Sequence, residues 1–406
     1  MEGWRSLQYF ASDSLSHLTL DFRLDFRSGL TGDHVHRYVG AVRDACVNFC
    51  HLVKGSLRSL AAEINKENEA VLAPAFTEMV QHLPNIRKLR VPLGGTGLSS
   101  SFHRLCQLRD LAFLDVKAHP GSFDEVERLH NSIPSKPFKG LRTLRFESTI
   151  SFYQPIIHSI QSTSLNSLRL VFRELCPLPA ESFNSLIQAT CCATTSLQVF
   201  DLTIHMPSSR RLLSSLPTVA VLLPLFAHRK LQELVIDLGV PIRFTDADID
   251  TIACMWPRLW KLRLISATGF CEGVGSDMKR NDSWKPQATC KAVMALLYHL
   301  ENLTELAIEF DATSLDELEG NVKSVAERDE FLGLGVSGRT ERGRILRTSA
   351  LKKFDAGRSR PGEALNLACW FAVLCPKLRE LQWTGENEGW ERASAMLQRI
   401  QGRAVV

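Results

Sequence analysis

The stretch FTDADIDTIACMWPRLWKLRLISATGF, residues 244–270, changes its hydrophobic period half-way. Its first half spaces apolar residues three and four apart, as one face of an α-helix requires, at Ile249, Ile252, Ala253 and Trp256. Pro257 then ends the helical pattern, and Leu262 and Leu264 follow two residues apart, as one face of a β-strand requires. The stretch predicts a short amphipathic helix that leads directly into a short strand. Neither element can bury its apolar face alone, so further copies are expected.

The strand half of this unit, L-x-x-L-x-L or a weaker variant, recurs along the chain. We call the second apolar residue of each copy its anchor, because it marks the spacing of the units. Eight of the eleven gaps between anchors are 24–34 residues long, and the gaps of 42, 44 and 48 residues indicate insertions or degenerate units. The twelve anchors are Leu18, Leu60, Leu89, Leu114, Leu144, Leu168, Phe200, Leu234, Leu262, Leu306, Phe354 and Leu381.

This period and motif are typical of leucine-rich repeats, which stack as a solenoid. We therefore predict a curved α/β solenoid of about twelve irregular repeats, with parallel strands on its concave face and helices on its convex face. A generic α/β protein with leucine-rich helices would need helix-length segments at the strand positions, and the joins are too short for them. The predicted parts are an N-terminal cap (1–14), a solenoid (15–385) with insertions near 265–290 and 311–348, and a C-terminal capping helix (386–406).

Composition favours a chain outside the secretory pathway and the membrane. The first residues, MEGWRSLQYF, lack a basic segment followed by an apolar run, so no secretory signal is expected. The longest uncharged stretch, residues 212–228, holds 17 residues and two prolines, which is short of the ~20 that span a bilayer. It predicts a buried helix. The 11 cysteines are expected to be free thiols, and the chain to be cytoplasmic, nuclear or both.

The sequence offers no recognisable catalytic or cofactor motif. The glycine-rich segment GGTGLSSS, residues 94–101, lacks the Gly-Lys-Ser/Thr that binds a nucleotide's phosphates. No G-x-S-x-G or H-E-x-x-H motif is present, and the cysteines lack the paired spacing of a zinc site. We therefore expect no enzymatic activity, no cofactor and no metal.

The candidate binding residues are those immediately before and after each anchor in its strand, because side chains alternate across a strand. On the predicted concave face they are mostly basic in the first half of the chain and alternate in sign in the second. Such a face suits a protein or peptide partner with its own charge pattern. The residues that we assign to it are Lys88, Arg90, Phe113, Asp115, Arg145, Arg169, Glu233, Lys261 and Arg263.

Nucleic acid is a weaker candidate partner. Residues 338–361, GRTERGRILRTSALKKFDAGRSRP, carry a run of basic side chains. The net charge of the chain is only +4, however, and the sequence pI of about 8.5 is below the value above 9 that is typical of nucleic-acid-binding domains. No aromatic residues are interleaved for stacking on bases. We expect neither nucleic acid nor a membrane as a partner.

Residues 7–400 resemble the leucine-rich-repeat region of the large fungal F-box protein family. The most specific matches are the T-D-x-D-apolar helix start at 245–249, the W-P-x-L at 256–259 and the FDA at 310–312. The resemblance implies a repeat region that holds substrates for an SCF-type ubiquitin ligase. Only 14 residues precede the first repeat at Leu15, so binding to the ligase adaptor is expected only if an F-box is supplied upstream. The alternative is a free-standing scaffold or decoy.

Overall fold

The computed structural model consists of two compact units. The first comprises residues 1–174 and 185–197, and the second residues 175–184 and 198–406. The structure describes residues 15–22, 32–53, 55–64, 66–94, 98–119, 127–128, 138–160, 164–173, 180–205, 217–265, 286–313, 315, 349–384 and 387–402.

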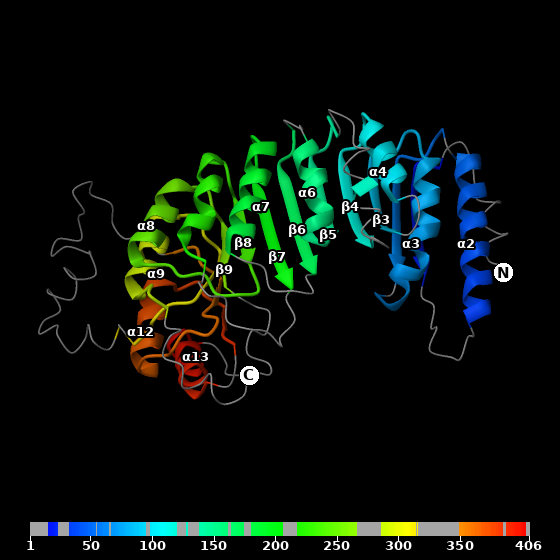
Figure 1. The fold of residues 1–406 in the computed structure, drawn as a ribbon. Helices are drawn as coiled ribbons and strands as arrows, with labels where there is room; N and C mark the ends of the chain where they lie inside the picture. The colour runs from blue at the N-terminus through cyan, green and yellow to red at the C-terminus, as the bar shows by residue number, and fades with distance from the viewer. Residues whose placement is uncertain are drawn as a thin grey trace, which may run out of the picture. The chain divides into compact units, whose positions relative to one another are not determined.

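In the first unit, six described strands pair in parallel in the order of the sequence, and helices cover one face of their sheet (Figure 1). The strands are β1 (His17–Phe22), β2 (Ser59–Ile64), β3 (Lys88–Gly94), β4 (Phe113–His119), β5 (Thr143–Ser148) and β6 (Ser167–Arg173). The helices are α2 (Gly32–Val53), α3 (Lys66–Gln81), α4 (Leu98–Gln107) and α6 (Ile150–Ser159). The boundary between the two units falls within α7 (Ala180–Ala193).

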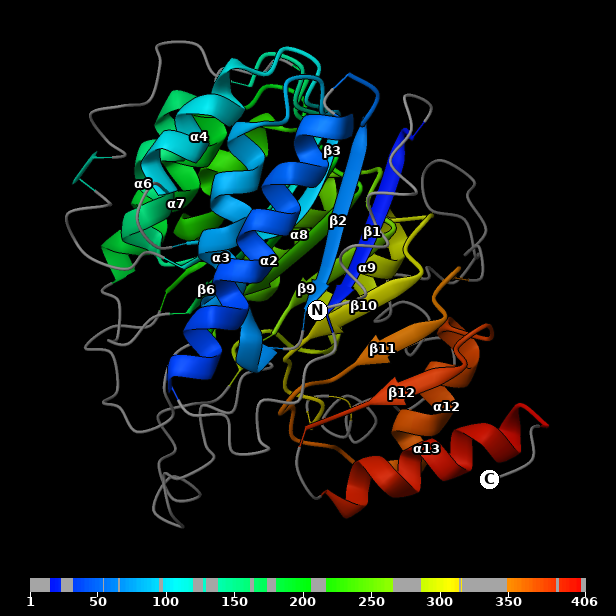
Figure 2. The same ribbon diagram turned by 90° about the vertical axis from the view of Figure 1, so that its right-hand side faces the viewer.

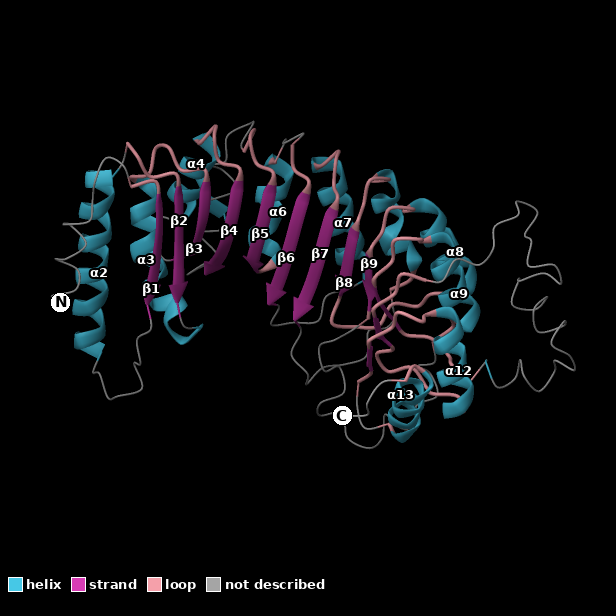
Figure 3. Cartoon of the chain, turned by 180° about the vertical axis from the view of Figure 1, so that it is seen from behind, coloured by secondary structure: helices cyan, strands magenta, loops and turns pink. Residues whose placement is uncertain are grey.

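The second unit repeats this arrangement with six further described strands, again parallel and in sequence order (Figure 3). The strands are β7 (Val199–His205), β8 (Glu233–Asp237), β9 (Lys261–Leu264), β10 (Glu305–Ile308), β11 (Lys353–Asp355) and β12 (Glu380–Gln382). The helices are η1 (Val219–Ala227), α8 (Asp246–Met255), α9 (Cys290–His299), α12 (Ala364–Leu374) and α13 (Glu388–Ile400). The alternation of parallel strands and helices confirms the predicted α/β solenoid.

The predicted anchors lie side by side in the sheets. In the first unit, register pairs join the six anchors from Leu18 of β1 to Leu168 of β6 without a shift. In the second unit, they join the six from Phe200 of β7 to Leu381 of β12. Leu18 and Leu381, in the first and last strands, are partly exposed, and the other ten anchors are buried. Each repeat therefore stacks the same apolar position on the next.

Aromatic side chains fill the space between the sheet and the helices of the second unit. Trp390 of α13 is fully buried, and its indole Nε1 donates a hydrogen bond to the Ser359 carbonyl oxygen at 2.8 Å. Its ring lies 6.2 Å from that of Phe310 and 6.5 Å from that of Phe371 in α12. Helix α13 thus packs beside α12 over the last repeats (Figure 2).

The uncharged stretch that predicts a buried helix forms η1, a 3-10 helix, over Val219–Ala227. Only part of its surface is buried, since Leu222 is inaccessible while Leu223 is 54% exposed. None of the described helices is long and apolar enough to cross a membrane.

Several predicted segments lie outside the described residues. They are the N-terminal cap, most of both insertions and residues 338–348 of the basic run. The domain boundaries therefore stay predictions.

The anchor ladder yields a prediction for stability. Leu262 is fully buried between the anchors of β8 and β10, so Leu262→Ala should lower the free energy of unfolding by about 2–5 kcal/mol, because it leaves a cavity between repeats. The neighbouring substitution Lys261→Ala removes a surface ion pair and should cost less than about 1 kcal/mol. Denaturant unfolding followed by circular dichroism measures both. Equal losses of unfolding free energy for the two variants would contradict the assignment of Leu262 to the core and Lys261 to the open face.

Candidate functional site

The candidate site lies on the open face of each sheet, which we define as the face opposite the helices. Buried and accessible residues alternate along the strands, as in β4 and β5. Anchors point into the core, so the residues immediately before and after each anchor stand on the open face. All the predicted binding residues are on this face, but the structure divides them between the units. Lys88, Arg90, Phe113, Asp115, Arg145 and Arg169 belong to the first unit, and Glu233, Lys261 and Arg263 to the second.

Four of these residues form a charged row across the first unit. The sheet register places Arg90 of β3, Asp115 of β4, Arg145 of β5 and Arg169 of β6 side by side. The Asp115 carboxylate lies between two guanidinium groups, 3.4 Å from Arg90 Nε and 3.9 Å from Arg145 Nη1. The row holds three positive charges and one negative charge. By formal charge the row is therefore predominantly positive.

Asp115 is more enclosed than the arginines on either side of it. Its side chain is 16% exposed, whereas that of Arg90 is 58% exposed. Burial raises the pKa of Asp115, and the charges of Arg90, Arg145 and Lys117 act in the opposite direction. Because three cations surround it, the carboxyl serves to position the guanidinium groups of its two neighbours.

Phe113 adds an apolar contact surface beside the charged row. It stands between Lys88 and Thr143 in the register, two residues before Asp115 in β4. The guanidinium carbon of Arg145 lies 6.0 Å from the centroid of its ring, within the range of a cation–π contact. The ring holds the Arg145 side chain close to the sheet. Aromatic and arginine side chains are the types that contribute most at protein interfaces.

The open face of the first unit continues beyond the residues that we predicted from the sequence. Lys117 of β4 forms an ion pair with Glu69 of α3, and Arg173 of β6 binds Glu147 of β5 at 2.7 Å between Nε and Oε1. These four residues complete two internal pairs and add no net charge. Lys117, Glu147 and Arg173 also follow the alternation of their strands. Lys117 and Glu147 lie two residues after Asp115 and Arg145, and Arg173 lies four residues after Arg169, so the sequence pattern could have identified all three.

The second unit carries a row in which the sign alternates at every strand. Its members pair in register from β8 to β12: Glu233, Lys261, Glu305, Lys353 and Glu380. Lys261 Nζ lies 3.4 Å from Glu305 Oε2, and Lys353 Nζ lies 3.1 Å from Glu380 Oε2. The hydrogen bond and charge of Glu380 raise the pKa of Lys353. The alternation of charge that the sequence predicts is thus a ladder of ion pairs, in which Lys261 pairs with Glu305 and Lys353 with Glu380.

A buried carboxyl lies at the end of β10 in the second unit. Glu309 is 8% exposed, and its Oε1 accepts a hydrogen bond from the Arg358 backbone N–H at 3.3 Å. Burial raises the pKa of Glu309 to about 7, with Asp355 and Asp237 acting in the same direction and Arg358 in the opposite one. Arg263 Nη2 binds the Asp355 carboxylate at 3.5 Å, which places a second cation in this group. No sequence pattern reveals the burial of Glu309, because it depends on the turn that follows β11.

None of the family models matches the sequence, and neither does any curated protein. Among solved structures, the chain is similar to a chain in the crystal structure of the Rad7 and Elc1 complex in yeast. The TM-score is 0.43 and the identity 15%, over 93% of this chain and 71% of that chain. At these values the similarity carries no functional conclusion.

The buried carboxyl yields a pH-dependent prediction. Glu309 has a pKa of about 7 in the folded state, against 4.5 for an ordinary glutamate, so between these values the folded state holds the proton that the unfolded state has lost. The contribution of Glu309 to the free energy of unfolding therefore falls as pH rises through this range. Glu309→Gln keeps the acceptor oxygen and removes the titration. Above pH 7 it should be more stable than the parent chain, by at most about 3 kcal/mol at 1.36 kcal/mol per pKa unit.

Denaturant unfolding at a series of pH values between 4 and 8 measures this effect. The matched control is Glu391→Gln, a substitution of an exposed glutamate in α13, which should leave the pH profile unchanged. The same slope in the parent chain and in Glu309→Gln would show that Glu309 titrates normally.

Proposed function

We propose that this chain is a protein-binding solenoid that holds an acidic segment of its partner on the open face of the first unit. The observation that carries this proposal is the row of Arg90, Asp115, Arg145 and Arg169, in which guanidinium groups outnumber the carboxylate by three to one on a sheet of fixed register. Paired strands hold these side chains at set spacings, so little ordering is needed on binding. The alternating ladder of the second unit is nearly self-neutral and lacks this excess of positive groups.

The residues beside the row suit an interface rather than a reaction. Lys88 is exposed next to Phe113, and together with Arg145 they offer cationic and aromatic contacts. Asp115, the enclosed carboxyl of the row, lies between the guanidinium groups of Arg90 and Arg145 and serves to position them. We therefore propose binding without catalysis. A specific and stable contact of this kind buries on the order of 1,200–2,000 Å² in total.

The resemblance of the repeats to the fungal F-box family supports a finer proposal, that the bound protein is a substrate for SCF-type ubiquitination. In that role an F-box supplied upstream would dock on the ligase adaptor, while the repeats hold the substrate. The alternative is a scaffold or decoy that binds the same partner without recruiting a ligase. Affinity capture from native extract, followed by mass spectrometry, separates them. Ligase subunits among the captured proteins support the first role, and a partner without them supports the second.

The binding face is tested by charge reversal. Lys88→Glu combined with Arg169→Glu should weaken binding of a fluorescent polyglutamate peptide at least tenfold and flatten its dependence on salt, because the two substitutions together lower the charge of the open face by four units. Fluorescence anisotropy at several ionic strengths measures the dissociation constant. The control is Arg229→Glu with Lys230→Glu, which makes the same change of net charge in an exposed turn of the second unit. Equal weakening by both double variants would show that only net charge matters and would move the site elsewhere.

A further inference from the structure

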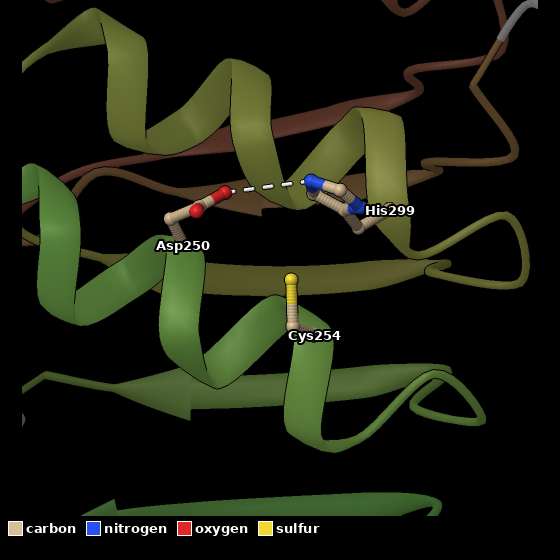
Figure 4. Close-up of side chains that lie close together, drawn as sticks. All are labelled: Asp250, Cys254 and His299. Carbon is tan, nitrogen blue, oxygen red and sulfur yellow. Dashed lines mark ion pairs between the residues drawn. The ribbon is translucent and has the colours of Figure 1, made fainter.

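Three side chains with metal-binding atoms converge on the helical side of the second unit. Asp250 and Cys254 lie one turn apart on α8, and His299 is the last residue of α9. A carboxylate oxygen, the thiol sulfur and a ring nitrogen all lie within 4.8 Å of one another, and His299 Nε2 is 3.4 Å from Asp250 Oδ1 (Figure 4). In the part of the chain that the structure describes, no other group of three such donors converges in this way.

The helices that carry these donors are held together at their starts. Asp246, the first residue of α8, accepts two hydrogen bonds from Thr289, from its backbone N–H at 2.7 Å and from its hydroxyl at 2.8 Å. Thr289 in turn caps α9, and Thr245 caps α8 through a reciprocal pair of bonds with Asp248. The backbone positions of the donors are therefore set before any ion binds, which lowers the cost of binding.

The three donors lie on the accessible side of their helices. Below α8, Ile252 and Trp256 are fully buried, so the face that carries Asp250 and Cys254 points outward. The ring of Tyr298, itself 46% exposed, meets that of His299 edge to face at 5.0 Å. The donor side chains remain accessible, with 57% of Asp250 and 35% of His299 exposed. An ion can therefore reach the site from solvent.

We propose that Asp250, Cys254 and His299 bind one divalent ion of the Zn²⁺ class. A thiolate, an imidazole nitrogen and a carboxylate oxygen together suit Zn²⁺ or Co²⁺, whereas Mg²⁺ and Ca²⁺ take oxygen donors. Zinc bond lengths of about 2.0–2.3 Å place tetrahedral donors about 3.3–3.8 Å apart. The separations here reach that range by rotation of accessible side chains. Water occupies the fourth position.

The proton balance of binding follows from the donors. The ion takes the place of the thiol proton of Cys254, which is released to solvent, and binds the neutral form of His299. It also replaces the contact between His299 and Asp250. Protons compete with the ion for the thiol and the ring nitrogen, so affinity decreases as pH falls.

Cobalt titration of the tag-free full chain tests the site, because a cobalt–thiolate bond gives a charge-transfer absorption that carboxylates and imidazoles do not. The expected result is one Co²⁺ per chain with this absorption, which Zn²⁺ then displaces. Cys254→Ser should abolish the absorption, and His299→Gln should weaken Co²⁺ binding at least tenfold. Zn²⁺ should raise the melting temperature of the parent chain and leave that of Cys254→Ser unchanged, since only binding to the folded state stabilises it.

The controls are Cys192→Ser and Cys369→Ser, which remove other exposed free thiols and should bind Co²⁺ as the parent chain does. All four substitutions are at accessible or partly accessible positions, and melting without metal checks that each variant is folded. The proposal is overturned if the parent chain shows no charge-transfer absorption, if Cys254→Ser retains it, or if His299→Gln binds as tightly as the parent.

Discussion

Within each unit, every strand places one apolar anchor directly beside the equivalent anchor of the next strand, and the fold of the unit depends on this contact. A fully buried leucine such as Leu262 contributes about 1.5–3 kcal/mol relative to an exposed one. No single repeat can bury its anchor, because the anchor needs a repeat on each side. The register of the sheet is therefore determined by the core, and a slip of one residue would expose every anchor in the strand.

The same register arranges the charges on the open face. Residues next to equivalent anchors lie side by side, so Arg90, Asp115 and Arg145 meet although they come from three different repeats. In the second unit the same geometry turns Glu233, Lys261 and Glu305 into neighbours of alternating sign. Formal positive charges predominate in the first row, whereas ion pairs link neighbouring strands in the second. This difference is why we assign the binding role to the first unit.

The helical side has a separate chemistry, because its helices pack through their inner faces and leave their outer faces accessible. The proposed ion site occupies the outer faces of α8 and α9, whose starts are tied by Asp246 and Thr289. Glu309, in contrast, lies buried near the ends of the strands, where it stabilises the turn after β11 through Arg358. The proposed ion site and Glu309 are both separate from the charged rows of the open face.

The sequence alone determined the repeat fold, the twelve anchors and the residues of the open face, because periods of two and of three to four report which side of an element is apolar. It also indicated the alternating charges of the second unit. Only the tertiary structure showed that Asp115 lies between two arginines, that Glu309 is buried, and that His299 meets Asp250 and Cys254. Those contacts join different repeats, and loops of unequal length set which side chains meet, so local periodicity contains no record of them.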